Sequence, residues 1–139
     1  MQSKLIEAVG ALINASAGER IRLPAPDDEL IDSYESQMEI TFGDEYRYFL
    51  KNASTINFGN IEPLVLSRDI NSRGDLLQAI KIARRLGVPF KWLPVCEDNG
   101  DYYCLDQTGN IRFWSGDGVS SESWPTLADW IIDVWIGGN

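Results

Sequence analysis

Histidine is absent from this sequence of 139 residues, and cysteine occurs only twice, as Cys96 and Cys104. Without histidine the chain lacks the commonest general base, the usual Ser/His/Asp and Cys/His nucleophilic systems, and imidazole metal sites. Two cysteines alone cannot form a four-ligand zinc site. A phosphate-binding loop is also missing, because Ser121 stands where a third glycine should follow Gly116-Asp117-Gly118, and Asp117 would repel phosphate. We therefore expect no enzymatic activity and no bound cofactor.

Long hydrophobic runs are missing as well. No apolar stretch approaches the roughly 18 residues that a membrane-spanning helix needs. The stretch from Leu5 to Ile13 is interrupted by Glu7 and has the periodicity of an amphipathic helix, which differs from the continuous apolar core of a signal peptide. Apolar residues make up 44% of the chain, enough for a packed core in a domain of this length. We predict a single cytoplasmic domain over residues 1–139, with no membrane partner.

Basic residues are scarce, since 12 Lys and Arg stand against 21 Asp and Glu and give a net charge of −9. The imbalance is strongest in residues 91–139, which carry 2 basic and 8 acidic side chains. A second acidic segment, from Leu23 to Tyr46, contains eight carboxylates and no basic residue: Asp27, Asp28, Glu29, Asp32, Glu35, Glu39, Asp44 and Glu45. Such a field repels nucleic acid and attracts basic proteins. Solubility alone is the alternative explanation for the overall charge.

Local signals predict five helices. We expect them at Ser3–Ala15, from a cap at Asp27 or Asp28 to Met38, at Gly43–Ala53, from Gly74 or Asp75 to Arg85, and from Thr126 onward. The fourth has the clearest end, because Gly87 follows it and Pro89 prevents its continuation. Thr126 and Asp129 have the spacing of a capping box. The core face of the last helix is expected to hold Leu127, Trp130, Ile131 and Val134.

Short strands are expected between the helices, at Ile56–Phe58, Ile61–Leu66, Lys91–Glu97, Tyr102–Asp106 and Asn110–Ser115. Asn99-Gly100 is a type I′ hairpin signal and would place Asp98 opposite Asp101 and Cys96 opposite Tyr103. Cys104 would then lie on the other face of the sheet, so no disulfide is expected. The same register predicts a core face formed by Trp92, Cys96, Tyr103 and Leu105. Hairpin-connected strands predict an α+β fold, with a mostly antiparallel sheet packed against several helices.

Carboxylates surround the predicted hairpin: Glu97, Asp98, Asp101 and Asp106, with Asp117 further along. Their spacing does not match a calcium-binding EF-hand loop. Three interpretations remain at this point. The residues are ordinary turn formers on a solvated face, they contact a protein partner, or they bind a divalent metal or act as an acid–base pair.

Five tryptophans are present, and core packing is the expected role for most of them. Trp114 and Trp124 flank the segment Ser115–Ser123, which reads as a loop. We therefore expect these two to be the most exposed of the five. Tryptophan beside carboxylates is a composition found at the centre of protein-binding surfaces.

Three stretches together resemble the SUKH superfamily, the Smi/Knr-like group. They are Phe42–Leu50, the hairpin region Trp92–Asp106 with its continuation to Trp114, and Thr126–Ile131. The resemblance extends over roughly Asp28–Ile136. It implies a non-enzymatic α+β domain, and most bacterial members of the superfamily are immunity proteins that neutralise a cognate toxin of a contact-dependent or polymorphic toxin system. Many of those toxins are nucleases.

An acidic surface fits such a partner, because a nuclease active site is built to attract phosphate. The residues expected to contact a basic protein toxin are Asp98, Asp101, Asp117 and Glu122, with Trp114 as an apolar anchor. No family motif assigns these contacts. Two alternatives stay open: a regulatory or interaction domain of the same fold without a toxin, and a carboxylate-based, metal-binding enzyme.

Overall fold

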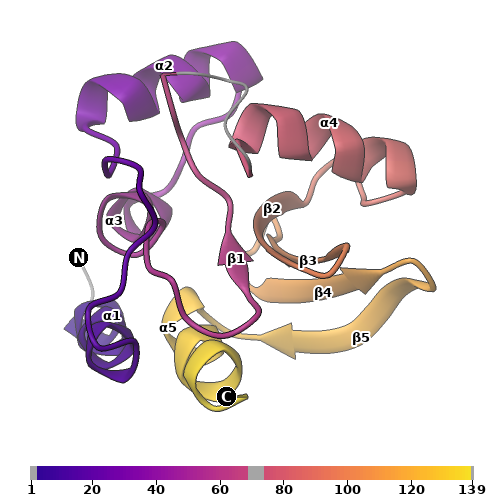
Figure 1. Cartoon of the computed structure of the whole chain (residues 1–139). Helices are drawn as coiled ribbons and strands as arrows, with labels where there is room; N and C mark the ends of the chain where they lie inside the picture. Colours follow the sequence, from indigo (N-terminus) through magenta and orange to yellow (C-terminus); the bar gives the residue numbers. More distant parts are fainter. Residues whose placement is uncertain (1–2, 69–73, 139) are drawn as a thin grey trace.

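The computed structural model describes residues 3–68 and 74–138 and contains one five-stranded antiparallel sheet. The strands are β1 (Glu62–Pro63), β2 (Leu93–Asp98), β3 (Asp101–Leu105), β4 (Ile111–Ser115) and β5 (Gly118–Trp124), and they lie side by side in chain order. Helices flank the sheet on both sides: α4 (Leu76–Leu86) covers one face, while α1 (Ser3–Ala15), α3 (Asp44–Asn52) and α5 (Leu127–Trp130) gather on the other (Figure 1). The predicted α+β class is confirmed.

Helix boundaries follow the local signals. Asp27 caps α2 (Asp28–Met38) by accepting a hydrogen bond from the Leu30 N–H at 2.9 Å, and Asp75 caps α4 by accepting from Leu77 and Gln78. Gly87 ends α4 with a φ of 114°, a conformation that only glycine adopts without strain. Each predicted helix is therefore present, with ends within one or two residues of those expected.

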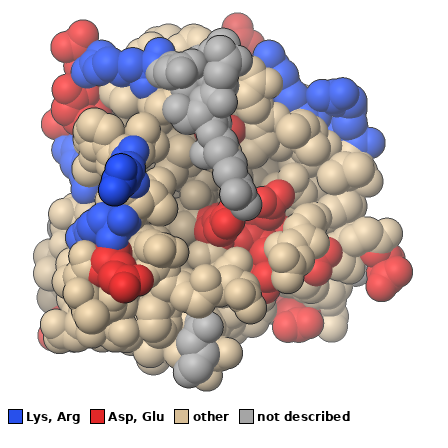
Figure 2. Space-filling model, viewed as in Figure 1, with Lys and Arg blue, Asp and Glu red and all other residues tan. Residues whose placement is uncertain are grey.

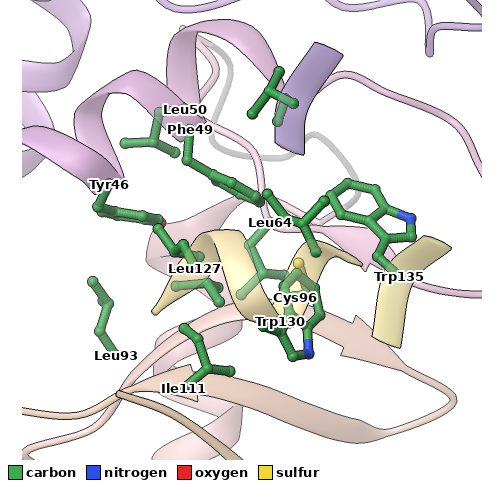
Figure 3. Packing of buried hydrophobic residues seen from close by; sticks show 14 of the residues in the cluster. Tyr46, Phe49, Leu50, Leu64, Leu93, Cys96, Ile111, Leu127, Trp130 and Trp135 are labelled. Atoms are coloured by element: carbon green, nitrogen blue, oxygen red, sulfur yellow. The ribbon is translucent and has the colours of Figure 1, made fainter. Parts of the chain in front are cut away.

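Two cores hold the layers together. The larger cluster fills the space between the sheet and α1, α3 and α5 and also includes buried residues of α2 and of the first half of α4; Figure 3 shows Trp130, Trp135, Phe49 and Cys96 inside it. The smaller cluster lies between the sheet and α4 and contains Ala83, Val88, Tyr102, Cys104 and Trp114. Because Cys96 and Cys104 belong to different cores, they are free thiols on opposite faces of the sheet, as predicted.

The sheet departs from the sequence prediction in its first and last strands. Ile56–Phe58 and Ile61–Leu66 form isolated bridges and the two-residue strand β1, although the Gly59-Asn60 turn between them is present. Residues 118–124, expected to belong to a loop, form β5 and pair with β4.

One core assignment was wrong. Trp92 packs against the smaller cluster, on the face opposite Cys96, because a bulge between Pro94 and Cys96 reverses the alternation of β2. The chain after α5 continues as a π-helix, η1 (Ile131–Ile136), in which Ile131 and Trp135 are buried and Val134 is partly buried against the larger cluster, as predicted for Ile131 and Val134.

The start of α5 yields a prediction about acid stability. Asp129 accepts hydrogen bonds from Lys4 and from the Thr126 hydroxyl, and both lower the pKa of its carboxyl group. A lowered folded-state pKa stabilises the protein above the unfolded value of about 3.9 and loses that effect as the pH falls through the folded-state pKa. Asp129→Asn should therefore lower the free energy of unfolding at pH 7, and the difference from the wild type should shrink toward about pH 2.5. Urea unfolding at both pH values measures the free energies of unfolding of the variant and the wild type. A difference between the two proteins that is the same at both pH values would contradict the stabilising role assigned to the Asp129 carboxylate.

Candidate functional site

Two β-turns bring carboxylates to the same end of the sheet. Asn99 and Gly100 have φ values of 51° and 89° and form the predicted turn, so Asp98 pairs directly with Asp101. The turn Gly116-Asp117 joins β4 to β5 at this end, which lies away from α5 in Figure 1. Since neighbouring strands lie about 4.8 Å apart, the two turns are roughly 10 Å apart. Four predicted contact residues, Asp98, Asp101, Asp117 and Glu122, thus lie on two adjacent hairpins, and we call them the acidic hairpin surface.

Three of these carboxylates act on the same tyrosine, Tyr103. Burial, followed by nearby negative charges that include Asp98, Glu122 and Asp101, raises the pKa of Tyr103 to about 12. Asp98 and Asp101 pair two positions from the Cys96–Tyr103 pair, so they lie on the same face of the sheet as Tyr103. Asp117 is exposed in its turn, where its N–H donates to the Ser115 hydroxyl at 3.3 Å.

Aromatic side chains form the floor beside the carboxylates. The ring of Tyr103 lies 5.0 Å from that of Phe113 and 5.9 Å from that of Trp124, centroid to centroid, and all three side chains are partly exposed. On its inner side Tyr103 packs against buried Trp130 at 5.1 Å, which fixes its position. Sequence reasoning missed Phe113. Pairing β3 with β4 places Phe113 opposite Tyr103, and the alternation of side chains along β4 then puts it on the face opposite Trp114.

Trp114 is not part of this surface, and its prediction as an exposed apolar anchor was wrong. Its side chain is only 4% exposed and packs beneath α4 against Tyr102, with ring centroids 6.1 Å apart. The cause is the extra hairpin: once residues 118–124 pair with β4, Trp114 becomes an interior position of a central strand. Alternation then points it to the face opposite Phe113. Trp124 remains partly exposed.

The acidic hairpin surface differs from the acidic segment around α2 in how its charges are paired. Arg47 forms ion pairs with Asp28, Asp32 and Glu35 at 2.8–3.0 Å, so those carboxylates link α2 to α3. None of the four residues of the acidic hairpin surface forms an ion pair within residues 3–68 and 74–138. These charges therefore remain available to a partner.

Acidic side chains also gather in the middle of one face of the molecule, over the region where β1 and β2 lie (Figure 2). Basic side chains lie at upper right over α4, and on the left basic and acidic side chains lie next to one another. Glu62 of β1 pairs in register with Glu97 of β2, next to the Asp98–Asp101 pair.

The structure does not assemble the carboxylates as a metal site. Asp106 lies at the other end of β3, about 17 Å from Asp101 at the usual rise of a strand. Its carboxylate accepts hydrogen bonds from Thr108 and the Asn110 N–H and lies 3.6 Å from Arg112, which are the contacts of a turn. In the described part of the chain, no group of three or more His, Cys, Asp or Glu side chains is arranged to hold a metal ion.

Within the same described residues, no helix has the length and apolarity that crossing a membrane requires.

A helix-flanked antiparallel sheet makes this chain an α+β domain. The profile of the family described as SUKH_5: SMI1-KNR4 cell-wall matches residues 3–136, so the chain belongs to this family. Among solved structures, a protein from Pseudomonas syringae pv. tomato is similar over 95% of this chain and 98% of its own, with 31% sequence identity and a TM-score of 0.83. No curated protein matches the chain.

Proposed function

We propose that this protein is a non-enzymatic immunity protein that binds a cognate basic toxin and neutralises it through the acidic hairpin surface. The observation that supports this most directly is the set of carboxylates without an ion pair in the described structure, Asp98, Asp101, Asp117 and Glu122, displayed on two adjacent hairpins. Carboxylates next to partly exposed aromatic rings match the rim and centre of a protein-binding surface.

The chemistry of a nuclease suits this surface. An active site that attracts phosphate has a positive potential, and carboxylates presented on two adjacent hairpins can occupy it. The same charges accelerate the encounter, because oppositely charged surfaces steer association. In this proposal the protein acts in the cytoplasm, where it would meet such a toxin.

Co-expression tests the proposal. We expect the product of the adjacent gene to be toxic when expressed alone, and co-expression of this chain to restore growth and yield a one-to-one complex. Rescue by a variant that lacks the four surface carboxylates should fail. A non-toxic neighbouring product, together with recovery of a housekeeping complex that this chain regulates, would favour the alternative of a regulatory domain.

A further inference from the structure

A groove lies away from the acidic hairpin surface, between the segment that joins α2 to α3 and the segment that joins α4 to β2. We propose that it docks an apolar segment of a partner protein that carries a carboxylate. Its volume of about 670 Å³ lies in the range of specific binding sites. The apolar part of its lining comes mainly from Met38, Ile40, Phe42, Phe90, Trp92 and Leu93.

Phe90 gives the groove an exposed apolar rim. Its side chain is 74% exposed, the highest exposure among the large hydrophobic residues of the described chain. Arg84 holds it there: the guanidinium carbon lies 4.1 Å from the ring centroid, and Nη2 donates to the Phe90 carbonyl at 3.2 Å. An aromatic ring fixed in an exposed position is preorganised for contact, since a partner need not order it.

The charges of the groove favour an anionic group. Arg84 and Lys91 both line it, and neither forms an ion pair with any described residue. Arg84 Nε is buried and has no acceptor in the described structure, and burial lowers the pKa of this guanidinium. Lys91 is exposed at the edge of the groove, so a carboxylate from a partner would pair with its ammonium group.

Two carboxylates of this chain also line the groove. Asp106 is held by Arg112 at 3.6 Å and by its own turn, so its charge is already compensated. Glu39 is the other. Counting partners among the described residues alone, two unpaired cations against one unpaired carboxylate make the groove locally positive in a chain whose net charge is −9.

The shape indicates a protein segment as the occupant. A bilayer cannot enter a concave groove, and the net charge of −9 would repel an anionic membrane. The exposed ring of Phe90 extends the apolar surface beyond the hollow, so an occupant that covers both must be longer than a compact small molecule. Extended or helical segments with apolar anchors bind grooves of this kind.

A selection from displayed random peptides of about twelve residues, with the full chain as bait, tests the proposal. Selected peptides should be enriched in Leu or Phe together with Asp or Glu. In calorimetric titrations of the synthetic peptides, Phe90→Ser and Lys91→Gln should each weaken binding about tenfold, which corresponds to about 1.4 kcal/mol. Both side chains are exposed, so the fold should be retained.

Lys81→Gln and Ile82→Ser are matched controls, because they remove an exposed cation and an exposed apolar side chain of α4 that do not line the groove. They should change the affinity less than twofold, as should neutralisation of the acidic hairpin surface. A selection that yields only basic peptides, or no peptide that depends on Phe90 and Lys91, would overturn the proposal. So would Phe90-dependent capture of the chain by vesicles of phosphatidylserine and phosphatidylcholine.

Discussion

Neutralising the acidic hairpin surface with Asp98→Asn, Asp101→Asn, Asp117→Asn and Glu122→Gln should slow association with the basic toxin by about 100-fold at low ionic strength. The four carboxylates are partly or fully exposed and unpaired within the described structure, so their removal takes away long-range attraction and leaves the internal contacts in place. Stopped-flow or surface-based kinetics at several salt concentrations measure the effect. The difference from the wild type should narrow as salt rises, because exposed charges are screened.

A second fourfold variant provides the control. Glu7→Gln, Glu19→Gln, Glu29→Gln and Asp133→Asn remove the same amount of charge from exposed positions outside the two hairpins. If only the net charge of −9 mattered, both variants would slow association equally, and the acidic hairpin surface would lose its proposed role.

Trp130→Ala should destabilise the fold by about 3–5 kcal/mol, the range for removing a buried aromatic side chain. Trp130 is completely buried, and its ring centroid lies 5.8 Å from that of Trp135 and 5.1 Å from that of Tyr103. Truncation would leave a cavity between the sheet and α5 and remove the support beneath Tyr103. Urea unfolding at pH 7 measures the loss.

Two further substitutions test whether the loss of stability comes from the buried Trp130 ring. Trp130→Phe should cost clearly less, because the indole N–H has no acceptor in the described structure and its removal breaks no hydrogen bond. Ile132→Ala, at a position of η1 that is 44% exposed, should change stability by about 0.5 kcal/mol or less. Equal losses for Trp130→Ala and Ile132→Ala would contradict the assigned core.

Short sequence signals predicted much of this fold, because the helix ends and the tight turn are determined by residues next to them in the chain. Asp27, Asp75 and Thr126 cap helices through their own side chains, and Asn99-Gly100 forms its turn with little help from the rest of the chain. The pairing of Asp98 with Asp101 follows from that turn. This pair is the part of the acidic hairpin surface that the sequence placed correctly, whereas Glu122 joins it through β5, which the sequence did not predict.

The misplaced residues depend on contacts between distant segments. The strand Gly118–Trp124 is rich in serine and contains Glu122, so its composition resembles a loop, and pairing with β4 overrides that preference. The burial of Trp114 follows from this pairing. The groove beside Phe90 combines residues 38–43, Tyr46, Arg84, residues 90–93, residues 105–107 and Gly109, and no local pattern predicts that these segments meet.

The position of the two thiols gives the protein an internal reporter of partial opening. Burial raises the pKa of both, to about 12 for Cys104 and well above the ordinary value for Cys96, so neither reacts readily while its core is closed. Cys104 is shielded by α4, and Cys96 by the helices of the opposite layer. If α4 detaches alone, Cys104 should be alkylated before Cys96. If the whole domain unfolds cooperatively, both thiols should be alkylated together.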